Sequence, residues 1–221
     1  MKKDSVVMQH DSLLKLADKS LTKEELFREV ERNPDLIPIL LGGISSQKAT
    51  IRYGCAKVLV DLSVKYPERL YPYMDFFVNL LDSKYRILTW NAMAIIANLA
   101  SVDKNKKFDV IFDKYYGFVN DEYMVTVANV VGNSAKIALA KPHLVQKITN
   151  ELLKVENIAI TPHLTEECRR VIAEKTIEAF DVFFDRIEAK AKVISFVRQQ
   201  LDSPRSALRT EAERFLKKWN R

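Results

Sequence analysis

The sequence repeats a helix-length segment in which small and apolar residues recur at matching places. Three copies begin at Ile51, Leu88 and Met124, so the period is 37 and then 36 residues. A fourth copy begins at Leu208, and a longer unit of similar type lies over residues 144–187. Periods of this length are typical of two-helix units that cannot bury their apolar faces alone and must stack on one another. The chain is therefore predicted to fold as a row of helix pairs.

Local signals for helix ends fill most of the remaining chain. Thr22 with Glu25 makes a capping box. A long helix is expected to begin at Ser46, and the last one is expected to be capped by Ser203 with the following proline in its first turn. Residues 155–164 form the longest stretch without a helical pattern and hold the only candidate strand, which has nothing to pair with. We expect an all-α fold of about ten helices in four to five stacked units.

Composition excludes several other classes of protein. Only 5 of 221 residues are glycine, too few for hairpins, Rossmann turns or phosphate-binding loops, which need glycine at fixed positions. The 2 cysteines lie far apart, which excludes a disulfide scaffold and a thiolate zinc site. No apolar run approaches the roughly 20 residues that span a bilayer, and the polar first residues lack a signal-peptide core. We expect a cytoplasmic protein without membrane insertion.

The repeated segment resembles the second helix of HEAT repeats, whose pattern is V/I-R-x-x-A-A-x-A-L-x-x-L. The first matching set is Ile51, Arg52, Cys55, Ala56, Leu59 and Leu62. The last matching set is Leu208, Arg209, Ala212, Leu216 and Trp219. The stretch AMAIIANLA is also similar to the last helix of armadillo repeats. The resemblance covers most of residues 36–221 and implies a right-handed α-solenoid that serves chiefly as a scaffold binding proteins or, less often, nucleic acids.

We expect one domain over residues 1–221. Within it, residues 1–35 are an atypical N-terminal cap, 36–203 hold the repeats, and 204–221 form a C-terminal capping helix. The interior positions of the second helices are expected to be buried: Leu59, Leu62, Ile95, Leu99, Val131, Ile177 and Leu216.

A row of polar side chains recurs just before the terminal leucine of successive units. It comprises Asp61, Asn98 and, with a one-residue ambiguity, Asn133 or Ser134. In the armadillo proteins that the chain resembles, a ladder of Asn side chains holds the backbone of an extended peptide, since an amide both donates and accepts. The resemblance therefore implies a partner-binding row that includes Trp90, which lies eight residues before Asn98. The alternative is hydrogen bonding between neighbouring repeats.

Basic residues gather at the C-terminal end. Residues 186–221 hold ten bases and four acids, an excess that equals the net charge of +6 of the whole chain. On the last helix, Arg205, Arg209 and Lys217 share one sector while Leu208 and Phe215 lie in another. These bases are candidates for contact with nucleic acid or an acidic protein partner. The alternative is a solvated face without a partner.

Aromatic residues are dense between positions 66 and 123. Most are expected to pack between the first and second helices of each unit. For consecutive pairs such as Tyr115 and Tyr116, at least one member is expected to be exposed or to lie in a groove, where it could anchor a partner.

Catalytic readings find little support in the residues. The three histidines, His10, His143 and His163, have no metal partner at ligand spacing. Cys55 and Cys168 sit in apolar patterns and are expected to be buried, inert thiols. The acidic stripe of residues 174, 178, 181 and 185 is expected to be a solvated face.

The function predicted from the sequence is therefore a non-catalytic scaffold, without metal or cofactor, that binds a protein or peptide on its concave surface. The alternative is a nucleic-acid-binding protein related to the DNA glycosylases with a HEAT-like fold. No catalytic residue of those enzymes can be carried over to this chain.

Overall fold

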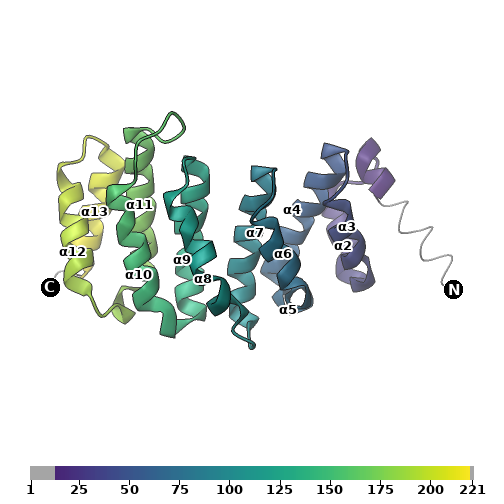
Figure 1. Ribbon diagram of the computed structural model, residues 1–221, viewed down its shortest axis with the longest axis horizontal. Coiled ribbons are helices and arrows are strands. Elements are labelled where there is room, and N and C mark those ends of the chain that lie inside the picture. Colours follow the sequence, from purple (N-terminus) through teal and green to yellow (C-terminus); the bar gives the residue numbers. More distant parts are fainter. Residues whose placement is uncertain (1–12, 220–221) are drawn as a thin grey trace. The chain divides into compact units, whose positions relative to one another are not determined.

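The computed structural model describes residues 13–219, and every helix or turn of helix in that range is shown in Figure 1. Within the described residues the only β-type pairing is an isolated bridge between Thr161 and Leu164. The all-α prediction is confirmed. The chain divides into two compact units, Met1–Lys104 and Asn105–Arg221, and each is taken in turn below.

The first unit is built around one long central helix, α4. Residues 13–18 are also helical, and the helices that follow are α2 (Lys23–Arg32), α3 (Ile37–Gly43), α4 (Ala49–Lys65), α5 (Pro67–Leu70), α6 (Met74–Leu80) and α7 (Arg86–Leu99). Helix α4 packs against α2 and α3 on one side and against α7 on the other, while α6 packs on α7. Short 3₁₀ turns join α2 to α3 and α5 to α6, as is common at helix ends and in connectors.

The ends of these helices follow the local sequence in one case and depart from it in another. The capping box at α2 is confirmed: the Thr22 hydroxyl accepts the Glu25 N–H at 3.2 Å, and the Glu25 carboxylate accepts the Thr22 N–H at 2.9 Å. Helix α4 begins at Ala49, so the prediction of a start at Ser46 is wrong. The Ser46 hydroxyl accepts the Lys48 N–H at 3.2 Å, which closes a turn before the helix can begin.

The second unit contains three long helices that pack in series. Its helices are α8 (Lys107–Gly117), α9 (Met124–Ala140), α10 (Val145–Leu153), α11 (Glu166–Phe183), α12 (Lys190–Gln199) and α13 (Ser206–Trp219). Helix α11 packs between α9 and α13, α10 lies against α9, and α12 lies against α13. Helix α13 begins at Ser206, two residues later than the predicted proline start. The Ser203 hydroxyl accepts the Arg205 N–H at 3.3 Å and holds Pro204 in the turn that precedes the helix.

The predicted insertion between α10 and α11 is fastened to the start of α9. A 3₁₀ turn, η6 (Lys154–Asn157), follows α10. The Thr161 hydroxyl donates to the Glu122 carbonyl at 2.7 Å, and the His163 ring stacks on Tyr123 with centroids 4.2 Å apart. Helix α11 then begins with Thr165 as its N-cap, whose side chain accepts the Cys168 N–H. The lone candidate strand forms no sheet.

Six of the seven predicted interior positions are buried. They are Leu59, Leu62, Ile95, Leu99, Val131 and Ile177. The prediction for Leu216 is wrong, because this side chain is only half-buried while its neighbour Phe215 is fully buried against the Phe184 ring at 5.0 Å. On α13 the buried stripe runs through Leu208, Ala212 and Phe215, and Leu216 lies about 100° further round the helix.

Tyr115 and Tyr116 are both buried, so the prediction that one of each consecutive aromatic pair is exposed is wrong for this pair. On α8 they share one face with Phe108 and Phe112, because residues at i, i+4, i+7 and i+8 lie within an arc of about 100°. The Tyr115 and Tyr116 rings contact each other edge to face at 5.5 Å. Consecutive residues can therefore form the two edges of one wide apolar stripe.

Candidate functional site

Asp61 lies in a groove between α2 and α4, which we call the α2–α4 groove. Its lining residues are Glu24, Phe27 and Arg28 of α2 and Asp61, Val64 and Lys65 of α4. The cavity has a volume of about 420 Å³. Val64 is 66% exposed although it is apolar, and Phe27 is half-buried beside it. The groove thus combines two apolar side chains with charges of both signs.

The charged groups around the α2–α4 groove are held by neighbours. Asp61 pairs with Lys57 at 2.6 Å, one helical turn earlier on α4. Lys65 pairs with Glu31, to which the Tyr66 hydroxyl also donates. Hydrogen bonds from Lys65 and then Tyr66 keep the pKa of Glu31 below its usual value, and the Glu31 carboxylate raises the pKa of Lys65. Both partners therefore stay charged at neutral pH, and the ion pair holds the Lys65 side chain in place beside the groove.

Asn98 makes the inter-helix hydrogen bond that was the alternative to a peptide ladder. Its amide donates from Nδ2 on α7 to the Ser63 hydroxyl on α4 at 2.9 Å. Ser63 is buried and donates in turn to the Val60 carbonyl at 2.6 Å. Trp90 lies half-exposed, two turns earlier on α7. The Asn98 side chain thus contributes to packing between successive helices of the first unit.

Asn133 belongs to the second unit and is bonded within its own helix. Its Nδ2 donates to the Asn129 carbonyl of α9 at 2.8 Å, and Asn129 donates likewise to the Val125 carbonyl. Ser134, the other candidate for this place in the row, is fully buried and accepts the Tyr116 hydroxyl at 3.2 Å. Of the predicted row, Asp61 is the residue that lines the α2–α4 groove, whereas Asn98, Asn133 and Ser134 are bonded to neighbouring groups of their own unit.

Arg205, a predicted partner-binding residue, is held by carboxylates of the neighbouring helix α11. Its Nε lies 2.7 Å from Glu174 and its Nη1 lies 2.7 Å from Glu167. The Arg205 guanidinium, followed by Arg170, holds the pKa of Glu167 below its usual value. Arg205, which directly precedes α13, is therefore held against α11 by two ion pairs, and its charge is not left to solvent or to a partner.

The acidic stripe of α11 is covered in part by α13, which corrects the expectation of a solvated face. Asp181 accepts from Trp219 Nε1 at 2.6 Å and from Lys218 Nζ at 2.9 Å, and Arg214 lies 3.5 Å away. Burial raises the pKa of Asp181, but these donors outweigh burial and leave it below its usual value. Residues 166–219 hold twelve bases and ten acids, so the basic end is largely neutralised by its own neighbour.

Arg209 and Arg52 perform the same structural task in the two units, which the sequence reading missed. The Arg52 Nη1 donates to the Ser46 carbonyl at 2.8 Å, and the Arg209 Nη1 donates to the Ser203 carbonyl at 2.5 Å. Each arginine thus closes the loop that precedes its own helix, six residues earlier in the chain. The signal was present, because both arginines occupy the same place in the repeated pattern. Lys217 is exposed on the same helix as Arg209.

The histidines and cysteines of residues 13–219 do not gather into a metal site. No group of three or more His, Cys, Asp or Glu side chains in this range could hold a metal ion. Burial raises the pKa of the Cys55 thiol to about 12, as expected for an inert thiol, whereas Cys168 is only half-buried, contrary to the prediction. His143 pairs with Asp109, and His10 lies outside the described residues. Among the described helices, none is long and apolar enough to cross a membrane.

Sequence comparison finds a limited likeness. No protein-family model matches the chain. A stretch of 100 residues is 30% identical to the uncharacterized protein MJ0078 of Methanocaldococcus jannaschii, covering 45% of this chain and 48% of that protein. The chain therefore spans about half the length of this curated relative.

Solved structures with a similar fold include two designed armadillo repeat proteins. The protein YIII(Dq)4CqI has a TM-score of 0.57 and 15% identity, over 93% of this chain and 89% of its own. The protein YIII(Dq.V1)4CPAF, solved in complex with peptide (KR)4, has a TM-score of 0.61 and 14% identity, over 94% and 91% of the two chains. With helices as the only regular elements of residues 13–219, the chain has the all-α solenoid fold of armadillo-type repeat proteins.

Proposed function

We propose that the protein is a non-catalytic scaffold that binds an extended segment of a partner protein in the α2–α4 groove. The observation that carries this proposal is Val64, an apolar residue exposed to 66% in a groove beside Phe27 and Asp61. A concave site that combines apolar side chains with a few polar groups is the usual form of a binding site. The likeness of the fold to a designed protein that was solved with a peptide supports the same class of partner.

The groove offers complementary contacts to a peptide. Phe27 and Val64 can pack against an apolar side chain of the partner, while Asp61 can accept hydrogen bonds from its backbone N–H groups. The present partner of Asp61 is Lys57, on the exposed surface of the same helix. Exposed pairs at this spacing contribute only about 0.3–0.5 kcal/mol, so a peptide donor can replace the lysine at little cost.

The nucleic-acid alternative has weaker support. Arg205, Arg214 and Lys218 all pair with acidic side chains of the second unit. A nucleic acid would therefore have to compete with internal carboxylates for three of the five bases in residues 205–218. We propose the protein partner for this reason.

Selection from a random peptide library on the intact protein tests the proposal. Enriched peptides are expected to lose affinity for the Val64→Glu variant, because a carboxylate would enter the apolar part of the groove. The matched control is Val110→Glu, since Val110 is an equally apolar residue that is 86% exposed in the second unit. Enriched peptides that bind the Val64→Glu variant as tightly as the unchanged protein would refute the groove as the site, and so would failure to enrich any peptide.

A further inference from the structure

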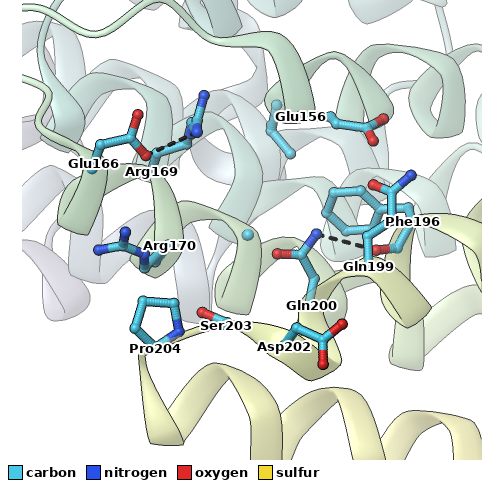
Figure 2. Close-up of a pocket in the computed structure, with 12 residues that line it drawn as sticks. Glu156, Glu166, Arg169, Arg170, Phe196, Gln199, Gln200, Asp202, Ser203 and Pro204 are labelled. Carbon is cyan, nitrogen blue, oxygen red and sulfur yellow. Dashed lines mark hydrogen bonds and ion pairs between the residues drawn. The ribbon is translucent and has the colours of Figure 1, made fainter.

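A polar cleft opens in the second unit, where η6, the start of α11, the end of α12 and the 3₁₀ turn η8 (Gln200–Asp202) meet (Figure 2). We call it the α11–η8 cleft. Its volume is about 320 Å³, at the lower end of the roughly 300–1,000 Å³ that is typical of ligand pockets. The polar side chains that line it include Glu156, Arg169, Arg170, Gln199, Gln200 and Asp202. None of the residues predicted from the sequence to bind a partner lines it.

The charges on its two sides differ in how well they are paired. Figure 2 shows Arg169 and Arg170 on one side of the cleft, and Glu156 and Asp202 on the other. Arg169 pairs with Glu166 at 2.8 Å, and Arg170 pairs with Glu167 of the same helix at 3.2 Å. Glu156 and Asp202 are exposed, and their carboxylates make no hydrogen bond or ion pair with any residue in the range 13–219. The charge that the cleft leaves unmatched is therefore negative.

The rest of the lining suits a long side chain with a cationic end. Val155, Ala173 and Phe196 supply an apolar floor, against which the methylene groups of such a side chain can pack. The Gln200 Nε2 donates to the Phe196 carbonyl at 3.2 Å, which leaves the Gln200 amide oxygen as an acceptor. The exposed Gln199 amide can both donate and accept, as a peptide backbone requires.

We propose that the α11–η8 cleft receives an arginine side chain from an extended segment of a partner protein. The guanidinium would lie between Glu156 and Asp202, because its planar, multidentate donors suit carboxylates better than a lysine ammonium does. The Gln199 and Gln200 amides would hold the flanking backbone. The inference rests on the proposed function in one respect, that the occupant belongs to a partner protein. It concerns a different surface from the α2–α4 groove.

The test uses the intact protein and an acetylated, amidated Gly-Arg-Gly-Arg peptide, with binding measured by isothermal titration calorimetry. A Glu156→Gln/Asp202→Asn double variant is expected to weaken binding about tenfold, since both acceptor charges are lost. The matched control is Asp185→Asn/Glu188→Gln, which removes two exposed carboxylates of the same unit that do not line the cleft. This control is expected to leave the affinity unchanged. Replacing each arginine of the peptide by citrulline, which keeps the shape and removes the charge, is expected to abolish binding.

The position at which the peptide binds is measured independently by nuclear magnetic resonance. The side-chain amide signals of Gln199 and Gln200 are expected to shift on titration with the arginine peptide. Equal weakening by the two double variants would mean that only net charge matters and would overturn the site. An absence of saturable binding, or shifts confined to residues outside the cleft, would overturn it as well. The library peptides and the Val64→Glu variant test the α2–α4 groove separately, so each proposal can fail while the other stands.

Discussion

The hydrogen bond between Tyr116 and Ser134 joins α8 to α9 in a place that is closed to water. Its loss is therefore expected to lower the free energy of unfolding. Both side chains are at most 1% exposed. The Tyr116 hydroxyl donates to Ser134 Oγ at 3.2 Å, and Ser134 donates to the Val130 carbonyl at 2.8 Å. Burial raises the pKa of Tyr116 far above its usual value, so the hydroxyl keeps its proton. Replacement of Ser134 by alanine leaves that proton without an acceptor.

The expected size of the effect follows from this geometry. A buried donor left without its partner costs about 1–3 kcal/mol, whereas an ordinary hydrogen bond contributes only about 0.5–1.5 kcal/mol. We therefore expect Ser134→Ala to lower the free energy of unfolding by about 1–3 kcal/mol. Tyr116→Phe is expected to cost less, because Ser134 still donates to Val130. The Ser134→Ala/Tyr116→Phe double variant should be more stable than Ser134→Ala alone, since it removes the unsatisfied hydroxyl.

Urea unfolding followed by circular dichroism measures these differences, provided that the dependence on urea concentration is the same for all variants. The control is Ser195→Ala on the exposed side of α12, which should change stability by no more than about 0.5 kcal/mol. If the double variant is as unstable as the sum of the two single variants, the penalty does not come from an unsatisfied hydroxyl, and the reasoning is refuted.

Three further predictions follow from burial and charge. In thiol labelling at mildly alkaline pH, Cys168 should react in the folded protein, and Cys55 only after denaturation, because burial raises the pKa of Cys55 to about 12; equal rates would contradict this. Phe215→Ala should lower the free energy of unfolding, measured with urea, by about 3–5 kcal/mol, and a loss below about 1 kcal/mol would contradict full burial. The folded pKa of Asp181 is lowered, so its stabilisation is present above the unfolded pKa of about 3.9 and is lost as pH falls through the folded value. Asp181→Asn should therefore be less stable at neutral pH and should lose less stability on acidification; equal acid sensitivity would contradict this.

The fold was predictable because its signals are local or periodic. The capping box of Thr22 and Glu25 involves residues three apart, and it forms as expected. The period that begins with Ile51 and Leu88 marks helices that need neighbours to cover their apolar faces. Burial of Leu59 and Leu99 follows from the same pattern. These inferences need no knowledge of which helix packs on which.

The errors arise where the answer depends on a neighbour that the sequence pattern does not identify. The pattern around Tyr115 and Tyr116 does not say how wide the buried stripe of α8 is, and both rings are covered. The role of Asn98 depended on whether Ser63, thirty-five residues earlier, lay within hydrogen-bond reach. The position of Asp61 in the α2–α4 groove depends on α2 as well as on its own helix, and the pattern of α4 does not identify α2 as its neighbour.

The same reasoning separates the three C-terminal bases that the sequence had grouped as equivalent surface charges. Lys217 is exposed, so Lys217→Gln should leave the thermal midpoint nearly unchanged. Arg205→Gln should lower the midpoint more, because it removes both the ion pair to Glu174 and the ion pair to Glu167 across two helices. Arg209→Gln should also lower it, since the Ser203 carbonyl loses its donor. Differential scanning calorimetry measures the three midpoints, and equal values for all three variants would show that the pairing of α13 with α11 contributes nothing to stability. If Lys217→Gln instead had the lowest thermal midpoint of the three variants, the assignment of Lys217 to the surface would be contradicted.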